Sequence, residues 1–280
     1  MTKAIIRETV EIPYSEGTIV IYDSERSNGR TRDNPFYGPA NSKTLLEQIR
    51  GPIDQPTGLV EPTTRDVVFV SESLFDDPRK IGQEFTERMK RNYLRAFTGI
   101  AHDPKTKLVS FVDYPKFDER SIVDGEDLAK RVNGGEFYEQ VSFDQVGANR
   151  EIKWGEVAKN RYIIAWTHGE EGAERLADLT SRHPNRKLFL YVPDVSRLTE
   201  RTARVAALVS AVVRLYVAGD GYGGDGAGSY AFGVAPAGAS GEAPQKNSTP
   251  QVYTKEVFSR ALDSAGFPGE IKPTLEFLPR

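Results

Sequence analysis

The chain has 280 residues, of which 38% are hydrophobic and 28% are charged, as in an ordinary globular protein. Its 37 Lys and Arg residues against 40 Asp and Glu residues give a formal net charge of -3, which argues against nucleic-acid binding through an overall positive charge. The sequence contains no cysteine, which excludes disulfides, thiolate nucleophiles and cysteine-ligated metals.

Three histidines, His102, His168 and His183, lie far apart without the spacing of a metal site, so we expect no bound metal. No charged and then apolar leader opens the chain, and no apolar run reaches the length of a membrane span. We therefore expect a cytoplasmic protein without membrane contact.

A β-hairpin is predicted at the start of the chain. Residues 4–14 alternate between apolar and polar side chains, and residues 18–22 form a β-branched and aromatic run. The short polar segment between them, which ends in Gly17, supplies the turn. We expect these two strands to begin the central sheet.

The segment after the second strand, SERSNGRT, resembles in length and order a phosphate-binding loop, G-x-x-x-x-G-K-[ST]. Gly29 and Thr31 match that motif, Arg30 keeps the positive charge of the lysine, and Ser24 replaces the first glycine. In such a loop, backbone N–H groups turn toward a phosphate and the hydroxyl holds Mg²⁺. The predicted nucleotide-binding residues are Ser24, Ser27, Asn28, Gly29, Arg30 and Thr31. A polar turn leaving the strand is the alternative.

Proline and glycine punctuate residues 32–64, and within them only residues 41–50 are predicted to be helical, with Asn41 or Ser42 as the N-cap. Because the phosphate loop of a nucleotide-binding protein normally runs straight into a helix, this Pro/Gly-rich excursion interrupts the expected continuity.

The next two predicted elements are a strand and a helix. Residues 66–71, DVVFVS, form a continuous apolar run that predicts a buried strand, with Glu72 at its carboxyl end. The sequence Asp76-Asp77-Pro78 is a helix start signal, and Gly99 is the predicted end of that helix. Its apolar face consists of Ile81, Phe85, Met89, Tyr93 and Phe97.

The remaining elements alternate between strands and helices. A strand over residues 108–112 ends at Asp113, and the charged insertion 116–158 contains predicted helices near residues 125–132 and 154–159. The later predicted elements are a strand at 162–166, a helix at 170–183, a strand at 187–192, a helix that Ser196 caps with Leu198, Val205, Leu208 and Val209 inward, a strand at 211–218, and an antiparallel strand at 229–235.

This alternation predicts an α/β fold with a mostly parallel central sheet and helices on both faces. We expect residues 1–236 to form a single α/β domain with an added N-terminal strand and a C-terminal β-hairpin. Residues 237–280 are then a linker followed by a short helix and an edge strand.

The order of elements over residues 15–236 resembles the RecA/KaiC-like branch of the P-loop ATPases. In that family a strand leads into the phosphate loop, and the next strand ends in an acidic residue that activates the attacking water. Glu72 occupies that place, so the resemblance implies a catalytic role for it. A later strand carries a metal-binding aspartate, followed by helices, strands and a terminal β-hairpin.

The sequence departs from this family at two catalytic features. The strand that should end in aspartate ends in Trp166-Thr167, and the phosphate loop lacks its first glycine and its lysine. Phosphoryl transfer depends on positioning and charge neutralisation, so these losses remove most of its catalytic basis. The resemblance therefore implies a pseudo-ATPase: a module that binds ATP or another nucleotide without metal and acts in regulation or assembly.

Several predicted strands end in side chains that can do chemistry. In an open parallel sheet the carboxyl ends of the strands form the ligand site, so these side chains should converge. They are Asp23, Ser24, Ser71, Glu72, Asp113, Thr167, His168 and Asp194. His168 is the histidine placed to act as an acid or base, and we predict that Glu72 and His168 are catalytic. Alternatively, Asp113 and Asp194 cap turns and His168 binds a loop.

Two other functions stay open. The degraded phosphate site and the long Pro/Gly-rich segments also fit a purely structural, self-assembling protein, such as a virion or filament subunit, whose partner is another copy or an assembly protein. The strand-end carboxylates and His168 also fit an α/β enzyme that acts on a small molecule.

Overall fold

The computed structural model describes residues 9–14, 17–22, 36–53, 57–89, 92–146, 150–211, 214–219 and 228–234. The chain divides into two units, residues 1–238 and 239–280, and every element described below belongs to the first. The predicted phosphate loop at residues 24–31 and the predicted C-terminal helix and edge strand lie outside the described residues.

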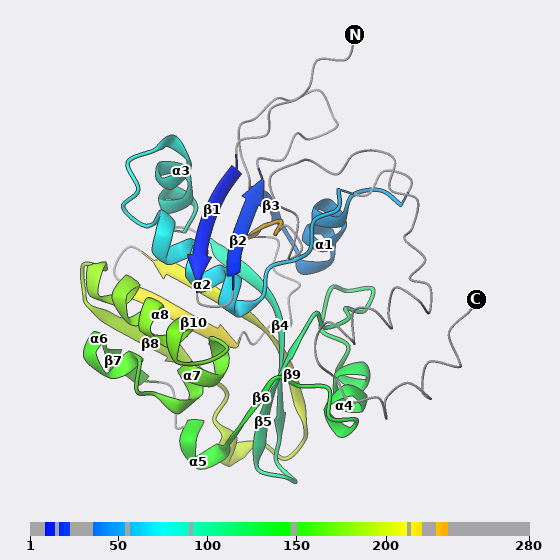
Figure 1. Cartoon of the computed structure of the whole chain (residues 1–280). Helices are drawn as coiled ribbons and strands as arrows, with labels where there is room; N and C mark the ends of the chain where they lie inside the picture. The colour runs from blue at the N-terminus through cyan, green and yellow to red at the C-terminus, as the bar shows by residue number, and fades with distance from the viewer. Residues whose placement is uncertain are drawn as a thin grey trace, which may run out of the picture. The chain divides into compact units, whose positions relative to one another are not determined.

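The described elements follow one another in the order shown in Figure 1. The strands are β1 (Thr9–Tyr14), β2 (Gly17–Tyr22), β3 (Phe36–Ala40), β4 (Tyr93–Asp103), β5 (Leu108–Asp113), β6 (Glu139–Ser142), β7 (Arg150–Lys153), β8 (Lys187–Tyr191), β9 (Thr202–Ala211), β10 (Arg214–Gly219) and β11 (Ser229–Phe232). The helices are α1 (Ser42–Arg50), α2 (Thr64–Leu74), α3 (Lys80–Met89), α4 (Gly125–Asn133), α5 (Phe143–Val146), α6 (Trp154–Val157), α7 (Arg161–Trp166) and α8 (Glu170–Arg182), with a 3-10 turn, η1 (Val195–Arg197).

The main sheet is mixed and mostly antiparallel. Its strands lie in the order β3-β11-β4-β9-β10-β8-β7, and β5 and β6 continue from β4 as a branch (Figure 1). Among the described residues, only the pairs β8–β10 and β4–β11 are parallel, whereas the other six pairs of this sheet are antiparallel. The predicted mostly parallel sheet is therefore wrong, and with it the RecA/KaiC-like fold and its P-loop assignment.

The branch in the sheet arises on β4. This strand pairs with β11 at Tyr93 and Leu94 and with β5 from Thr98 onward, and its pairing with β9 is irregular between Arg95 and Gly99. Such an irregularity bends a strand and increases its twist, so one edge of β4 can pair with two different strands. At the branch point, Thr98 lies directly opposite Asp113.

The predicted strand at 66–71 is wrong, because these residues belong to helix α2. Thr63 caps this helix in a capping box, in which its hydroxyl accepts from the backbone N–H of Asp66 and its own N–H donates to the Asp66 carboxylate. A capping box satisfies two backbone donors that would otherwise lack a partner and so starts a helix. The apolar run is continuous because Val67 to Val70 are all buried.

Two more elements of the second half differ from prediction. Residues 162–166 form α7 instead of a strand, and the Asn160 side chain caps this helix by accepting from Ile163 N. The predicted helix after Ser196 is the short turn η1 followed by β9. Strand β9 is covered on both faces, with Ala206 and Leu208 in the main core and Val205 in the cluster with α4, so its apolar pattern resembles that of a buried helix.

Other predicted elements are confirmed. The hairpin forms as β1 and β2, although it is a separate two-stranded sheet. The helix after Asn41 forms as α1, with that residue as its N-cap, and the predicted α4, α6, α8, β5, β8, β10 and β11 all form. The predicted C-terminal β-hairpin is wrong, because β11 pairs with β3 and β4 and not with β10. Helix α3 begins after Pro78 but ends at Met89, and Tyr93 and Phe97 lie in β4.

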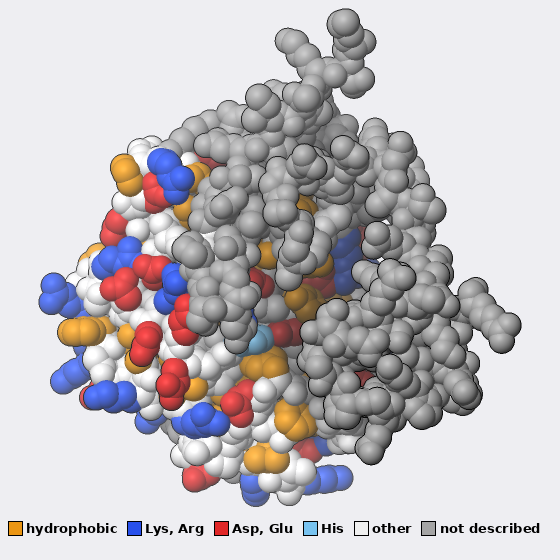
Figure 2. Space-filling view, in the orientation of Figure 1, with side chains coloured by type: hydrophobic (Ala, Val, Ile, Leu, Met, Phe, Trp, Pro, Cys, Tyr) orange, Lys and Arg blue, Asp and Glu red, His pale blue; other side chains and the backbone are white. Residues whose placement is uncertain are grey.

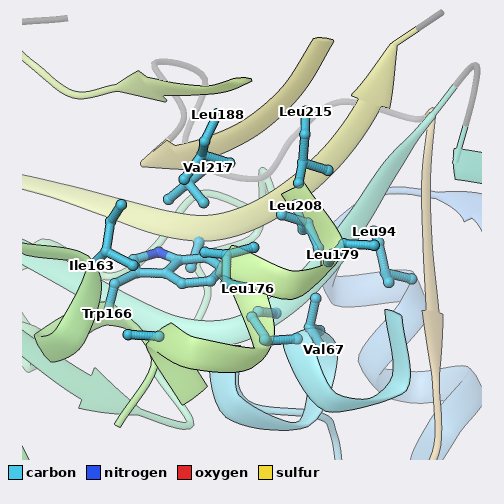
Figure 3. Close-up of a cluster of buried hydrophobic side chains, with 14 of the residues drawn as sticks. Val67, Leu94, Ile163, Trp166, Leu176, Leu179, Leu188, Leu208, Leu215 and Val217 are labelled. Carbon is cyan, nitrogen blue, oxygen red and sulfur yellow. The ribbon is translucent and has the colours of Figure 1, made fainter. Parts of the chain in front are cut away.

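Helices α2, α7 and α8 cover one face of the sheet and form the main core with it. Figure 3 shows side chains of these helices packed against strands β4, β8, β9 and β10. The labelled residues are Val67, Leu94, Ile163, Trp166, Leu176, Leu179, Leu188, Leu208, Leu215 and Val217. Helix α4 packs on the other face through Leu128, in a smaller cluster with Ala101, Val112 and Val205. None of the described helices has the length and apolar character needed to cross a bilayer.

Candidate functional site

His168 and Asp113 come together from two separate segments of the chain. Asp113 is the last residue of β5, and His168 follows α7. The Nε2 atom of His168 lies 3.4 Å from the Oδ1 atom of Asp113, and the two side chains are 14% and 21% exposed. A histidine that is open to solvent on one side and contacts a carboxylate on the other can act as a general base or acid.

A chain of hydrogen bonds holds the Asp113 carboxylate. The hydroxyl of the buried Thr98 donates to Asp113 Oδ1 at 2.7 Å, and it accepts from the backbone N–H of Thr64 at 3.2 Å. The guanidinium of Arg131 donates to the backbone oxygens of Asp113, at 2.9 Å, and of Tyr114, at 3.0 Å. These contacts tie the end of β5 to the N-terminus of α2 and to α4, so the carboxylate has a fixed position.

The imidazole of His168 is held by an aromatic stack. The ring of Tyr138 lies parallel to it, with centroids 3.6 Å apart and planes inclined by 16°. The Tyr138 hydroxyl donates to the backbone oxygen of Trp166 at 3.3 Å. Removal from water, together with the negative charge of Asp113, raises the pKa of Tyr138 well above its ordinary value, so the hydroxyl stays protonated.

The backbone is strained beside both members of the pair. His168 has a φ of 62° and Tyr114, which follows Asp113, has a φ of 55°. Side chains other than glycine rarely adopt this left-handed region, which costs on the order of 1–3 kcal/mol per residue, and such strain concentrates at functional sites. The Thr167 hydroxyl donates its one proton within the His168 turn, where the backbone oxygens of Ile163, at 2.8 Å, and Gly169, at 3.1 Å, are its acceptors.

A second carboxyl group, that of Asp66, lies near the pair. The pKa of Asp66 is raised, mainly by burial and also by the charge of Asp113. Hydrogen bonds from Thr63 and the charge of His168 oppose this rise. Tyr114 is 45% exposed, and burial raises its pKa, together with the charges of Asp66 and Asp113. The N-terminus of α2 and the end of β5 therefore share one electrostatic environment.

Glu72, the other predicted catalytic residue, lies on α2 and pairs with α8. One carboxylate oxygen contacts Arg175 Nη1 at 3.2 Å and the other contacts Arg182 Nη2 at 2.9 Å. Arg182 also donates to the backbone oxygens of Glu72 and Phe75 at 2.7 and 3.1 Å. These contacts join the two helices, and a catalytic role for Glu72 stays a prediction.

Asp194, which was also predicted at the site, is not part of this cluster. Asp194 caps η1, where its Oδ1 accepts from the Ser196 backbone N–H at 3.1 Å and from the Ser196 hydroxyl at 2.6 Å. The predicted nucleotide-binding residues Ser24, Ser27, Asn28, Gly29, Arg30 and Thr31 lie outside the described residues. In the described ranges, no group of three or more His, Asp or Glu side chains could hold a metal ion.

Sequence reasoning missed Thr64, Thr98, Arg131 and Tyr138. The Thr63-x-x-Asp66 capping box could have located the helix that carries Thr64. The other three residues carry no local signal, because pairing of distant segments brings them to Asp113 and His168.

The surface of this part of the molecule carries both signs of charge. Figure 2 shows Lys and Arg side chains interspersed with Asp and Glu over the face that carries α6, α7 and α8.

No protein-family model matches the sequence, and no curated protein matches it significantly. A solved structure that aligns with this chain comes from work described as "Accommodation of massive sequence variation in Nanoarchaeota by the C-type lectin fold". The alignment has a TM-score of 0.45 and 12% sequence identity, and it covers 74% of this chain and 96% of that chain. Because the TM-score is this low, the fold assigned above rests on the strand pairing alone.

Proposed function

We propose that Asp113 and His168 form an acid–base pair that acts on a small molecule. The 3.4 Å contact between His168 Nε2 and Asp113 Oδ1 carries this proposal. The Nε2 atom is buried and has no hydrogen-bond partner among the described residues, so this contact is a charge contact and not a formed hydrogen bond. When Nε2 carries the proton, the imidazole lone pair lies on Nδ1, where it can accept a proton. Asp113 then orients the imidazole and stabilises the imidazolium that forms.

Water is the nucleophile that this arrangement favours. Two hydroxyls beside the pair are already engaged as donors, since Thr98 donates to Asp113 and Tyr138 donates to Trp166. His168 takes a proton from a water molecule while the water oxygen attacks an electrophilic carbon of the substrate. It then returns that proton to the leaving group, so the pair ends in its starting state. The reaction class is therefore general-base hydrolysis.

Partial exposure and backbone strain support a chemical role over a structural one. Both side chains retain access to solvent, and His168 itself and Tyr114, which follows Asp113, lie in the left-handed region. The stack on Tyr138 and the hydrogen bonds to Asp113 hold the two groups in place before any substrate binds, which is the condition for efficient proton transfer.

The contacts of Asp113 and His168 do not test the other expectations from the sequence. Nucleotide binding at residues 24–31, self-assembly with another copy and a cytoplasmic location stay predictions. Calorimetric titration of the chain with ATP and ADP would decide the first of them.

Turnover of activated esters and amides by the full chain tests the acid–base pair. His168→Gln and Asp113→Asn should each lower turnover by about 100-fold or more, in line with the usual contribution of a general base. The double variant should lose little more than either single variant, because the two residues act as a unit. Asp194→Asn is the matched control, and it should retain wild-type turnover. Absence of turnover in the wild type, or full turnover in His168→Gln, would refute the pair.

A further inference from the structure

A groove lies between α3 and β11, apart from the acid–base pair. It has a volume of about 500 Å³, which is in the range of small-molecule sites. Its lining residues are Gln83, Glu84, Glu87, Arg88, Asn92 and Tyr230.

Arg88 is the cation of this groove. Its guanidinium carbon lies 4.7 Å from the ring centroid of Tyr230 and 5.8 Å from that of Phe36. Within the described ranges its guanidinium makes no hydrogen bond or ion pair, and its Nε atom is buried without a partner. Aromatic contacts hold a guanidinium in one plane and leave its N–H donors free for a carboxylate. Arg88 is therefore a preformed site for an anionic group.

Glu84 is an anion that this arginine does not neutralise. The two residues are four apart on α3, a spacing that allows an ion pair, yet no such pair forms in the described part of the chain. The Oε2 atom of Glu84 is buried and has no hydrogen-bond partner. Native structures seldom leave buried polar atoms unpaired, so this oxygen marks a place for a donor from a ligand.

Two amides add acceptors to the same groove. The side-chain NH₂ of Gln83 donates to Pro78 O at 3.0 Å, and that of Asn92 donates to Arg88 O at 3.2 Å. Each NH₂ group uses one of its two N–H donors in these bonds, and each amide oxygen can accept from a ligand. Among the described residues, the groove thus combines the guanidinium of Arg88 with several acceptors.

The inner wall of the groove is apolar. A smaller cavity that shares Arg88, Asn92 and Tyr230 with it is also lined by Phe85, Met89 and Leu94. This cavity has a volume of only about 10 Å³, so an apolar side chain of a ligand would not enter it and would lie over its mouth at Tyr230, while the charged groups of the ligand face Arg88 and Glu84.

We propose that this groove binds a zwitterionic ligand of the amino-acid type with an apolar side chain. Its carboxylate binds the guanidinium of Arg88, and its ammonium group donates to Glu84 and to the amide oxygens of Gln83 and Asn92. This charge pattern accounts for an arginine and a glutamate that lie one helical turn apart without pairing.

Calorimetric titration of the full chain with leucine and phenylalanine tests the groove. Both should bind saturably, whereas leucinamide, which lacks the carboxylate, and N-acetyl-leucine, which lacks the ammonium group, should each bind at least about tenfold more weakly. If N-acetyl-leucine binds as well as leucine, the groove takes a carboxylate alone, as at a peptide C-terminus, and the zwitterion assignment is wrong. Absence of saturable binding by every compound overturns the site.

Variants of the groove distinguish this site from the acid–base pair. Arg88→Gln and Glu84→Gln should weaken leucine binding at least about tenfold, and Arg88→Lys should also weaken it because it lacks the planar fork. The melting temperature of Arg88→Lys shows whether the fold is intact. Arg79→Gln, an exposed arginine that pairs with Asp77, is the matched control and should bind leucine normally. Asp113→Asn should also bind normally, and wild-type affinity in both groove variants would refute the proposal.

Discussion

Tyr138 and His168 stack face to face with their ring centroids 3.6 Å apart. Tyr138 precedes β6 and His168 follows α7, so the contact exists only when the β4–β5–β6 branch and the α7–α8 corner are both in place. The stack joins the side of the site that carries Asp113 to the side that carries the imidazole.

Two substitutions of Tyr138 separate its ring from its hydroxyl. Tyr138→Phe keeps the stack and loses the hydrogen bond to Trp166 O, so it should cost about 1 kcal/mol in urea unfolding and leave turnover close to wild type. Tyr138→Leu removes the stack and should lower kcat by about tenfold to a hundredfold with little change in KM, because the imidazole loses its orientation. Equal kcat in the two variants would show that the ring does not position His168.

The contacts of Glu72 with α8 predict a loss of stability on substitution. Glu72→Gln leaves Arg175 and Arg182 facing a neutral amide, which should lower the free energy of unfolding by about 1–2 kcal/mol. Glu151→Gln breaks the more exposed pair with Lys187 and should change it by less than about 0.5 kcal/mol. Urea unfolding measures both. A loss of turnover without a loss of stability in Glu72→Gln would support the predicted catalytic role instead.

From the burial of His102 we predict that acid lowers the stability of the folded protein. Burial, with the nearby charge of Arg204, lowers the pKa of His102 from 6.5 to about 3 in the folded state. The unfolded chain therefore binds a proton below pH 6.5 that the folded chain does not, so stability is full above this pH and falls as the pH drops toward 3. The loss approaches about 1.4 kcal/mol per pH unit.

His102→Gln keeps a buried polar side chain but removes the titration. We measure the free energy of unfolding of the wild type and this variant from about pH 7 to about pH 4. As the pH falls, the free energy of unfolding of the wild type should decrease relative to that of the variant, so a wild type that is the more stable at neutral pH should lose that advantage. Parallel curves for the two proteins would mean that His102 takes up its proton equally in both states.

We predict that alanine substitutions at two helical glycines, Gly172 and Gly155, change the stability of the protein in opposite directions. A Cβ atom at Gly172 of α8 would lie 2.2 Å from the backbone oxygen of Thr167, so Gly172→Ala should destabilise the protein by about 1–3 kcal/mol and disturb the adjacent His168. A Cβ at Gly155 of α6 meets no atom within 4 Å, so Gly155→Ala should stabilise it by about 0.5–1 kcal/mol. Thermal unfolding compares them, and a neutral Gly172→Ala would contradict the close packing of this corner.

Local sequence signals located the elements whose pattern is confined to a few residues. Asn41 marked the start of α1, and the charged first and last turns of α8 marked that helix, because capping and helix-dipole effects act within one turn. Residues 66–71 and 162–166 were assigned to strands, because a short apolar run is equally compatible with a buried strand and a buried helix. Their capping residues, Thr63 and Asn160, were the signals that distinguish the two.

The sequence by itself determined that Asp113 and His168 are chemically capable groups at the ends of elements. Only the tertiary structure decided that they touch. The contact arises from an arrangement of elements that differs from the predicted parallel sheet. Asp113 ends an antiparallel strand and His168 follows a helix, and Thr98, Tyr138 and Arg131 hold them in place. Strand pairing and helix packing between distant segments create these contacts, and such pairing leaves no periodic or local trace in the chain.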